Sequence, residues 1–165
     1  MQSIEASFMR TLRQLYDTEK QISASLAALC VAELEPTLIS LIKQMARQSD
    51  GQAERLEEVF SVLYLTPRTE AAWPATAMLR EAWNAVTEFE NEPSAEGCAA
   101  SLLALKQYEL CLYERLYCWA KRCALNEVLP GLRRSMAEEM LNSAALCQVA
   151  FGTPQLEAAS ELRLH

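Results

Sequence analysis

The chain has 165 residues, 51% hydrophobic and 22% charged, a balance typical of one globular domain. Its 22 Asp and Glu outnumber its 15 Lys and Arg, and the net charge of -7 disfavours binding to nucleic acid or to an anionic membrane surface. No apolar run is long enough to span a bilayer, and the first residues lack the order of a signal peptide. We therefore expect a cytoplasmic protein.

The residue pattern predicts an all-α chain. Ala, Leu, Glu, Gln, Arg and Met favour helix, and four Gly with six Pro leave little room for a turn-rich β architecture. Breaks near 33–36, 65–74, 91–95 and 124–131 separate four long helices and one shorter helix. We expect one helical bundle over residues 1–152, followed by a C-terminal tail at 153–165.

Polar residues interrupt the apolar seams of the first two long helices. Glu19 lies in the middle of a seam spaced by three and four positions: Phe8, Leu12, Leu15, Glu19, Ile22, Leu26 and Leu29. The second helix carries Ser49 and Gln52 near the centre of its seam, with Gln48 on an adjoining face.

The remaining elements repeat this pattern. The short segment 74–90 places Leu79, Trp83 and Val86 on one face, and we expect it to cross between helices or to cover a bundle end. Each of the last two long helices carries a glutamate in an otherwise apolar seam, namely Glu109 and Glu139.

Antiparallel pairing would bring these polar positions to matched depths. With a first turn near residue 34, Glu19 is level with Gln48, Ser49 and Gln52. With a last turn near residue 126, Glu109 faces residue 143 and Glu139 faces residue 113. Buried carboxylates must be neutralised, paired or metal-bound. The alternative is that each glutamate is an ordinary surface residue.

Four short segments of the chain resemble a known family. They are residues 16–21 (YDTEKQ), 52–60 (QAERLEEVF), 107–110 (QYEL) and 137–139 (AEE). In this order they are similar to the YciE/YciF-type ferritin-like family of bacterial stress-response proteins, over roughly residues 4–150. The resemblance implies a ferritin-like antiparallel four-helix bundle with an additional short helix, commonly dimeric, and a dimetal site at the bundle centre.

The resemblance also implies a set of site residues. Glu19, Gln52, Glu109, Glu138 and Glu139 match the family's pattern. Relatives have His and Glu on the second helix, Glu-His before Tyr-Glu, and an acidic residue after the Glu-Glu pair. This chain has other residues there: Met45 and Gln48, Lys106 and Gln107, and Asn142 or Ser143. The only histidine is His165, so the metal ligand set is depleted.

Lys106 suggests a replacement for the missing metal charge. It lies one helical turn before Glu109, so its ammonium could enter the carboxylate cluster as an internal cation. The alternative is a solvated ion pair on the helix surface. The sequence leaves both arrangements open.

Two functions follow from these residues. The first is a non-catalytic stress-associated protein with a degenerate dimetal site and no cofactor, acting as a homodimer or through an unidentified protein partner. The second is an iron- or manganese-binding carboxylate oxidase or ferroxidase-like protein that uses Glu19, Gln52, Glu109 and Glu139. Whether the chain is an enzyme stays open, with the non-enzymatic function favoured.

The six cysteines suggest a third function. They are Cys30, Cys98, Cys111, Cys118, Cys123 and Cys147, mostly inside apolar helical stretches and without a CxxC pair. We expect reduced, packed thiols. A redox role for Cys111, Cys118 or Cys123 is the alternative.

Overall fold

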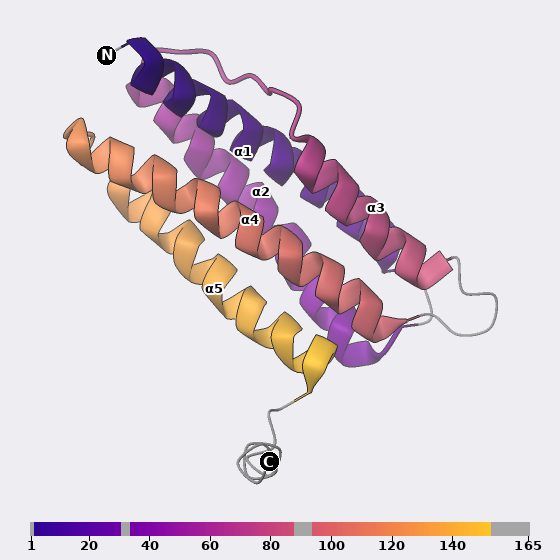
Figure 1. Cartoon of the computed structure of the whole chain (residues 1–165). Coiled ribbons are helices and arrows are strands. Elements are labelled where there is room, and N and C mark those ends of the chain that lie inside the picture. Colours follow the sequence, from indigo (N-terminus) through magenta and orange to yellow (C-terminus); the bar gives the residue numbers. More distant parts are fainter. Residues whose placement is uncertain (1, 31–33, 88–93, 153–165) are drawn as a thin grey trace, which may run out of the picture.

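The computed structural model describes residues 2–30, 34–87 and 94–152, and these form five α-helices and no strand (Figure 1). Their bounds are α1 Gln2–Leu29, α2 Pro36–Val62, α3 Trp73–Thr87, α4 Ala95–Arg122 and α5 Leu129–Phe151. The predicted all-α bundle of four long helices and one short helix is confirmed. The predicted tail at 153–165, with His165, lies outside the described residues.

The helix ends agree with local sequence signals. Pro36 opens α2. A backbone N–H at this position would have no acceptor within the helix, so proline loses no helical hydrogen bond there. Ser94 caps α4, and its Oγ accepts a hydrogen bond of 3.0 Å from the Gly97 backbone N–H. Lys121 and Arg122 lie in the last turn of α4, where positive charge favours the helix dipole.

The four long helices pair lengthwise, α1 with α2 and α4 with α5, and α3 packs along α4 and α1 (Figure 1). The short helix therefore lies along the side of the bundle, so the expected cover over a bundle end was wrong. On the inner face of α3, Leu79 and Val86 are buried. Trp83, which was predicted on the same face, is 41% exposed. Its wide ring lies at the edge of the contact with α1.

A polar layer divides the apolar core into two clusters. On α1, Leu12 and Leu15 belong to one cluster, and Ile22 and Leu26 belong to the other. Glu19 lies between them and is fully buried. Burying each large apolar side chain contributes about 1.5–3 kcal/mol, so two well-packed clusters can hold a costly polar layer in place.

The cysteines depart from the expectation of packed thiols. Cys98 is buried and Cys30 half-buried, but four thiols are exposed: Cys111, Cys118, Cys123 and Cys147. All six are free thiols. Cys111 follows Glu109 by two positions, about 200° around the helix, which turns it away from the seam. An apolar helical stretch includes outward-facing positions as well as the seam.

No helix in the described part of the chain is long and apolar enough to cross a membrane.

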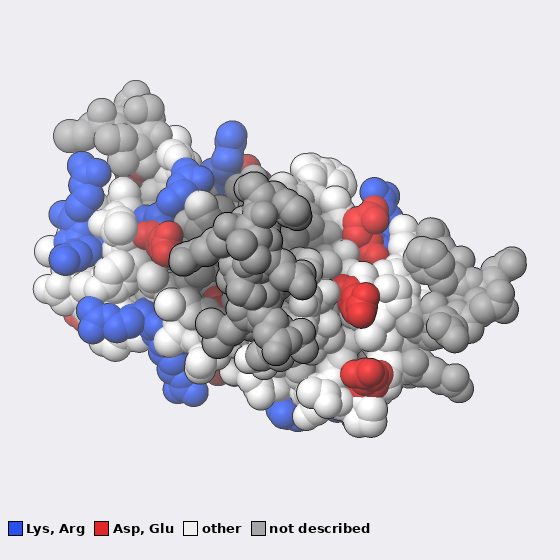
Figure 2. Space-filling view, turned by 60° about the horizontal axis from the view of Figure 1, so that its bottom comes forward, with Lys and Arg blue, Asp and Glu red and all other residues white. Residues whose placement is uncertain are grey.

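Charge is unevenly spread over the surface. In Figure 2, Lys and Arg gather mainly at the left, and Asp and Glu are prominent at the right. The rotation between the views keeps left and right, so the basic end is where α4 ends and α5 begins (Figure 1).

Candidate functional site

The four predicted site residues converge in the middle of the bundle. Glu19 comes from α1, Gln52 from α2, Glu109 from α4 and Glu139 from α5, and each is 0% exposed. The alternative of ordinary surface glutamates is therefore wrong for all three carboxyl groups. Depth matching along antiparallel helices placed them correctly because each interrupts a seam at the same height.

Lys106 lies inside this layer, not on the surface. Its side chain is 1% exposed, and its Nζ atom lies 3.3 and 3.0 Å from the two carboxylate oxygens of Glu109. The same Nζ lies 3.2 Å from each oxygen of Glu139, on the neighbouring helix. Burial alone would lower the pKa of Lys106, but Glu109, Glu139 and Glu19 outweigh it and raise that pKa. The side chain is therefore a buried cation.

Glu19 and Glu109 hold their protons more tightly than exposed glutamates do. Burial, assisted by the charge of Glu139, raises the pKa of Glu19 to about 7, against the lowering effect of Lys106. Burial and Glu139 also raise the pKa of Glu109 well above its usual value, again against Lys106. Both shifts favour the uncharged carboxyl form, which reduces the negative charge beside the single ammonium.

Tyr113 completes the layer and was missed in the sequence. Its hydroxyl is fully buried on α4 and donates a hydrogen bond of 2.7 Å to Glu19 Oε1. Burial, and then the charge of Glu19, raise the pKa of Tyr113 well above its usual value, so the hydroxyl keeps its proton. A signal existed, because the antiparallel count already placed residue 113 opposite Glu139.

Gln52 links the inner layer to a second set of charges. Its Nε2 donates hydrogen bonds of 2.8 Å to Glu139 Oε1 and 3.2 Å to Glu138 Oε2. Glu138 is 14% exposed and pairs with Arg55 and with Arg134, the latter at 3.0 Å. Glu138, assigned to the site by family resemblance, thus lies beside the inner layer and is neutralised there by arginine.

Neutral amides occupy some of the positions at which the sequence departs from the family pattern. Asn142 Nδ2 donates a hydrogen bond of 2.8 Å to Gln48 Oε1, and Gln44 Nε2 donates one of 3.3 Å to Asn142 Oδ1. Met45 is fully buried and packs in an apolar cluster. These side chains satisfy one another across α2 and α5, and they add no charge that would attract a cation.

The donor set does not fit a two-metal centre. No three His, Cys, Asp or Glu side chains in the described part of the chain are arranged to hold a metal ion. The Lys106 ammonium contacts both Glu109 and Glu139, so a metal ion on these carboxylates would meet a positive charge at close range. Two buried acceptors, Glu19 Oε2 and Gln52 Oε1, have no hydrogen-bond donor.

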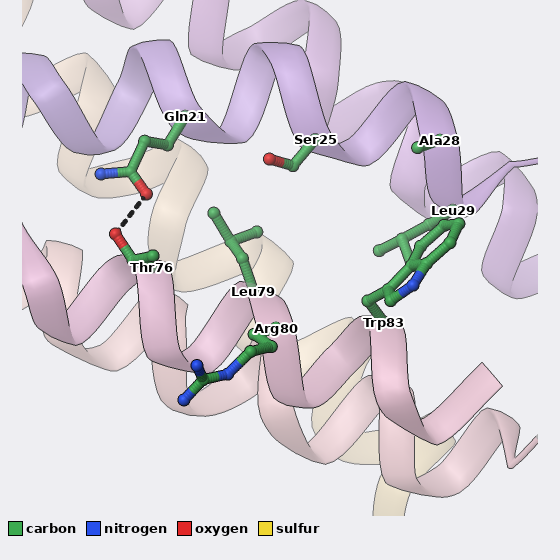
Figure 3. Close-up of a pocket in the computed structure, with 8 residues that line it drawn as sticks. All are labelled: Gln21, Ser25, Ala28, Leu29, Thr76, Leu79, Arg80 and Trp83. Atoms are coloured by element: carbon green, nitrogen blue, oxygen red, sulfur yellow. Dashed lines mark hydrogen bonds between the residues drawn. The ribbon is translucent and has the colours of Figure 1, made fainter. Parts of the chain in front are cut away.

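An open groove lies away from this layer, between α1 and α3 (Figure 3). It has a volume of about 310 Å³, and Leu29, Leu79 and Trp83 form its apolar part. A hydrogen bond of 2.8 Å from Thr76 Oγ1 to Gln21 Oε1 joins the two helices beside it. Glu19, Glu109 and Glu139, the carboxyl layer, do not line this groove, so the groove is separate from that layer.

The fold and the buried layer define a ferritin-like four-helix bundle with an additional helix. The chain belongs to the family described as domain of unknown function (DUF892), whose model matches residues 3–159. It is similar to protein YciF of Escherichia coli (strain K12), with 23% identity over 163 residues, which cover 98% of each chain. The resemblance found in the sequence is confirmed, and the chain is a divergent member.

Solved structures agree on the fold. The crystal structure of the E. coli stress protein YciF matches with a TM-score of 0.83 and 24% identity, over 91% of this chain and 96% of that chain. YcfI from Rhodopseudomonas palustris matches with a TM-score of 0.82 and 23% identity, over 90% and 95% of the two chains. Both likenesses confirm the ferritin-like bundle.

Proposed function

We propose that this protein is a non-catalytic, stress-associated bundle protein whose degenerate dimetal site is a structural layer neutralised by Lys106. In this proposal it acts through its surface, as a homodimer or as a module for a protein partner. The similarity to YciF, a stress protein, supports the physiological setting. The observation that carries the proposal is the Lys106 ammonium between Glu109 and Glu139.

The charge balance of the layer supports a structural role. A desolvated carboxylate without a partner is costly, and an ammonium at 3.0 to 3.2 Å supplies the opposite charge from within the chain. The raised pKa values of Glu19 and Glu109 reduce the negative charge that this ammonium must balance. In this proposal the layer therefore needs no external ion.

A divalent ion would have to compete with this arrangement. It would need Lys106 to withdraw from the two carboxylates or to lose its proton. The neighbouring carboxylates raise the pKa of Lys106 despite its burial, which opposes the loss of that proton. Withdrawal is opposed as well, because two apolar clusters flank the layer.

The outer face of α3 supports a function in association. Trp73 is 74% exposed and Trp83 41% exposed, and Trp83 lines the groove between α1 and α3 (Figure 3). Exposed aromatic side chains beside an apolar groove favour contact with another protein surface. A second copy of this chain is the simplest partner, in accordance with the dimer implied by the family resemblance.

Metal binding is the second candidate function. Glu19 Oε2 and Gln52 Oε1 are buried acceptors without donors, and oxygen atoms of this kind suit iron or manganese as ligands. This function would use Glu19, Gln52, Glu109 and Glu139 as a reduced ligand set. It requires the displacement of Lys106, which the first proposal does not.

The metal content of the purified protein distinguishes the two candidates. Cells are grown with added iron and manganese, and the wild type is compared with Glu109→Ala and with Glu57→Ala, a partly exposed control on α2. We expect far less than one metal ion per chain in all three proteins. Near-stoichiometric metal in the wild type and in Glu57→Ala, lost in Glu109→Ala, would establish the second candidate.

A further inference from the structure

A second cleft lies between α1 and α4 and has a volume of about 330 Å³. Glu19, Glu109 and Glu139 do not line it. Ser7 and Phe8 of α1 line it, together with Arg115, Cys118, Trp119 and Arg122 of α4. It therefore combines two guanidinium groups, a thiol and an aromatic wall, and the proposed function uses none of them.

The aromatic wall has a fixed position. The rings of Phe8 and Trp119 are stacked, with centroids 3.5 Å apart and planes inclined by 14°. Phe8 is buried and Trp119 is half-buried, and both residues line the cleft, so the stacked pair forms an aromatic wall there. A ligand can contact this surface without first ordering it.

The two arginines make the cleft positive. Arg115 and Arg122 are seven positions apart and share one face of α4. Arg115 Nη2 donates a hydrogen bond of 3.2 Å to Ser7 Oγ. Neither guanidinium pairs with a carboxylate of the described residues, whereas Arg10, Arg55 and Arg134 all do.

The surrounding surface favours anions as well. In a chain of net charge -7, the cleft lies toward the basic end of the bundle, the left of Figure 2. Lys121 adds a further positive charge in the last turn of α4. Unpaired guanidinium groups bind carboxylates with two parallel hydrogen bonds, which gives orientation as well as attraction.

Cys118 is placed to react with a bound anion. It lies three positions after Arg115 and four before Arg122, so it shares their face of the helix. Its thiol is exposed. Cys111, Cys123 and Cys147 are exposed too, but they do not line this cleft. The position of Cys118 thus differs from those of the other exposed thiols.

We propose that this cleft binds small anionic disulfides of the oxidised glutathione class and that Cys118 exchanges with them. Arg115 and Arg122 bind carboxylates of the ligand, and the Phe8–Trp119 wall contacts its uncharged part. The Cys118 thiolate attacks one ligand sulfur, the ligand S–S bond breaks, and a mixed disulfide forms. The other half leaves as a thiolate and takes up the proton that Cys118 released. Cys118 is oxidised, and the leaving half of the ligand is reduced.

Site-resolved kinetics test this proposal. The full chain is incubated with oxidised glutathione, quenched with acid, and digested, and the mixed disulfide at each cysteine is quantified by mass spectrometry. We expect Cys118 to react about tenfold faster than Cys111, Cys123 and Cys147, the lower end of electrostatic rate enhancement. With the uncharged reagent 2-hydroxyethyl disulfide, the four rates should become similar.

Variants identify the cause of any preference. Arg115→Gln with Arg122→Gln should abolish the preference of Cys118 for the anionic disulfide, whereas Arg133→Gln, on α5 outside the cleft, should retain it. Equal rates at all four cysteines in the wild type would overturn the proposal. So would a preference for Cys118 that survives in the double variant, or one that is equally strong with the uncharged reagent.

Discussion

The ammonium of Lys106 on α4 lies 3.2 Å from the carboxylate of Glu139 on α5, and both side chains are shielded from water. The two residues are 33 positions apart, so this ion pair fixes the relative height of the two helices. Glu109, one turn further along α4, shares the same ammonium. The partial neutralisation of the layer therefore depends on a contact between helices that no surface ion pair could replace.

Glu19 should make the protein less stable as the pH rises toward 7. Burial raises the pKa of Glu19 from 4.5 to about 7, so the folded state keeps a proton that the unfolded state loses near pH 4.5. The stability that this proton contributes is complete below pH 4.5 and is lost as the pH rises to about 7. Its size is about 3 kcal/mol at most, on the order of 1.4 kcal/mol per pH unit.

Urea unfolding of the wild type and Glu19→Gln across this pH range measures the effect. The difference in unfolding free energy between the two proteins should change in favour of the variant as the pH rises from 4.5 to 7. The amide retains an acceptor for Tyr113, so the variant should fold. A difference that is the same at every pH would show that Glu19 titrates alike in the folded and unfolded states.

Tyr113→Phe should destabilise the fold by about 1–3 kcal/mol, the cost of leaving a buried acceptor without its donor. The variant removes the hydrogen bond of 2.7 Å to Glu19 Oε1, and Glu19 Oε2 already has no donor. Tyr117→Phe is the matched control, because it removes an exposed hydroxyl that accepts from Arg133. Equal losses in chemical unfolding would contradict a special role for Tyr113.

Lys106→Ala should bind divalent cations more tightly than the wild type does. The change removes the ammonium and leaves the carboxyl groups of Glu19, Glu109 and Glu139 around the freed space. Manganese at 100 times its Kd would stabilise the variant by about 2.7 kcal/mol, a rise in Tm of several degrees. Thermal unfolding with and without Mn²⁺ measures this rise, and Lys20→Ala controls for loss of a surface lysine. An equal rise in the wild type would show that Lys106 does not exclude the metal.

Trp83→Asp should weaken self-association. A charge on the partly exposed edge of the groove between α1 and α3 would be desolvated in a dimer that covers this face. Met140→Asp is the control, because Met140 is 59% exposed and belongs to α5, a helix on the other side of the bundle from α3 (Figure 1). Sedimentation velocity should show a wild-type dimer, a Trp83→Asp monomer and a Met140→Asp dimer. A monomeric wild type would remove the basis for a homodimer.

The depth of the polar layer could be predicted from sequence because helical periodicity is regular. Glu19, Glu109 and Glu139 interrupt seams whose spacing fixes both face and height, and short turns fix the antiparallel register. The burial of Lys106 could be suggested but not decided. A four-carbon side chain one turn from a glutamate can reach either inward or outward, and only the position of Glu139 on another helix favours the interior.

Other parts of the site depend on contacts that periodicity does not encode. Arg55 reaches from α2 to Ser135 and Glu138 on α5, through a long side chain with many rotamers. The exposed cysteines were mistaken for packed ones, because an apolar composition does not reveal which face of a helix a residue occupies. Cys118 and Cys111 lie on α4 positions outside its buried seam.

The free energy of unfolding of Lys106→Met at pH 7 tests the central claim most directly. Removing one partner of a buried ion pair costs about 3–5 kcal/mol, whereas an exposed pair is worth about 0–1 kcal/mol. We expect a loss in the larger range for Lys106→Met and in the smaller range for Lys20→Met, whose ammonium lies 3.9 Å from Glu57 at the surface. Adding Glu109→Gln and Glu139→Gln to Lys106→Met should recover part of the loss, because the two carboxylates that contact the ammonium are then replaced by neutral amides. A loss below about 1 kcal/mol for Lys106→Met would contradict the internal-cation account.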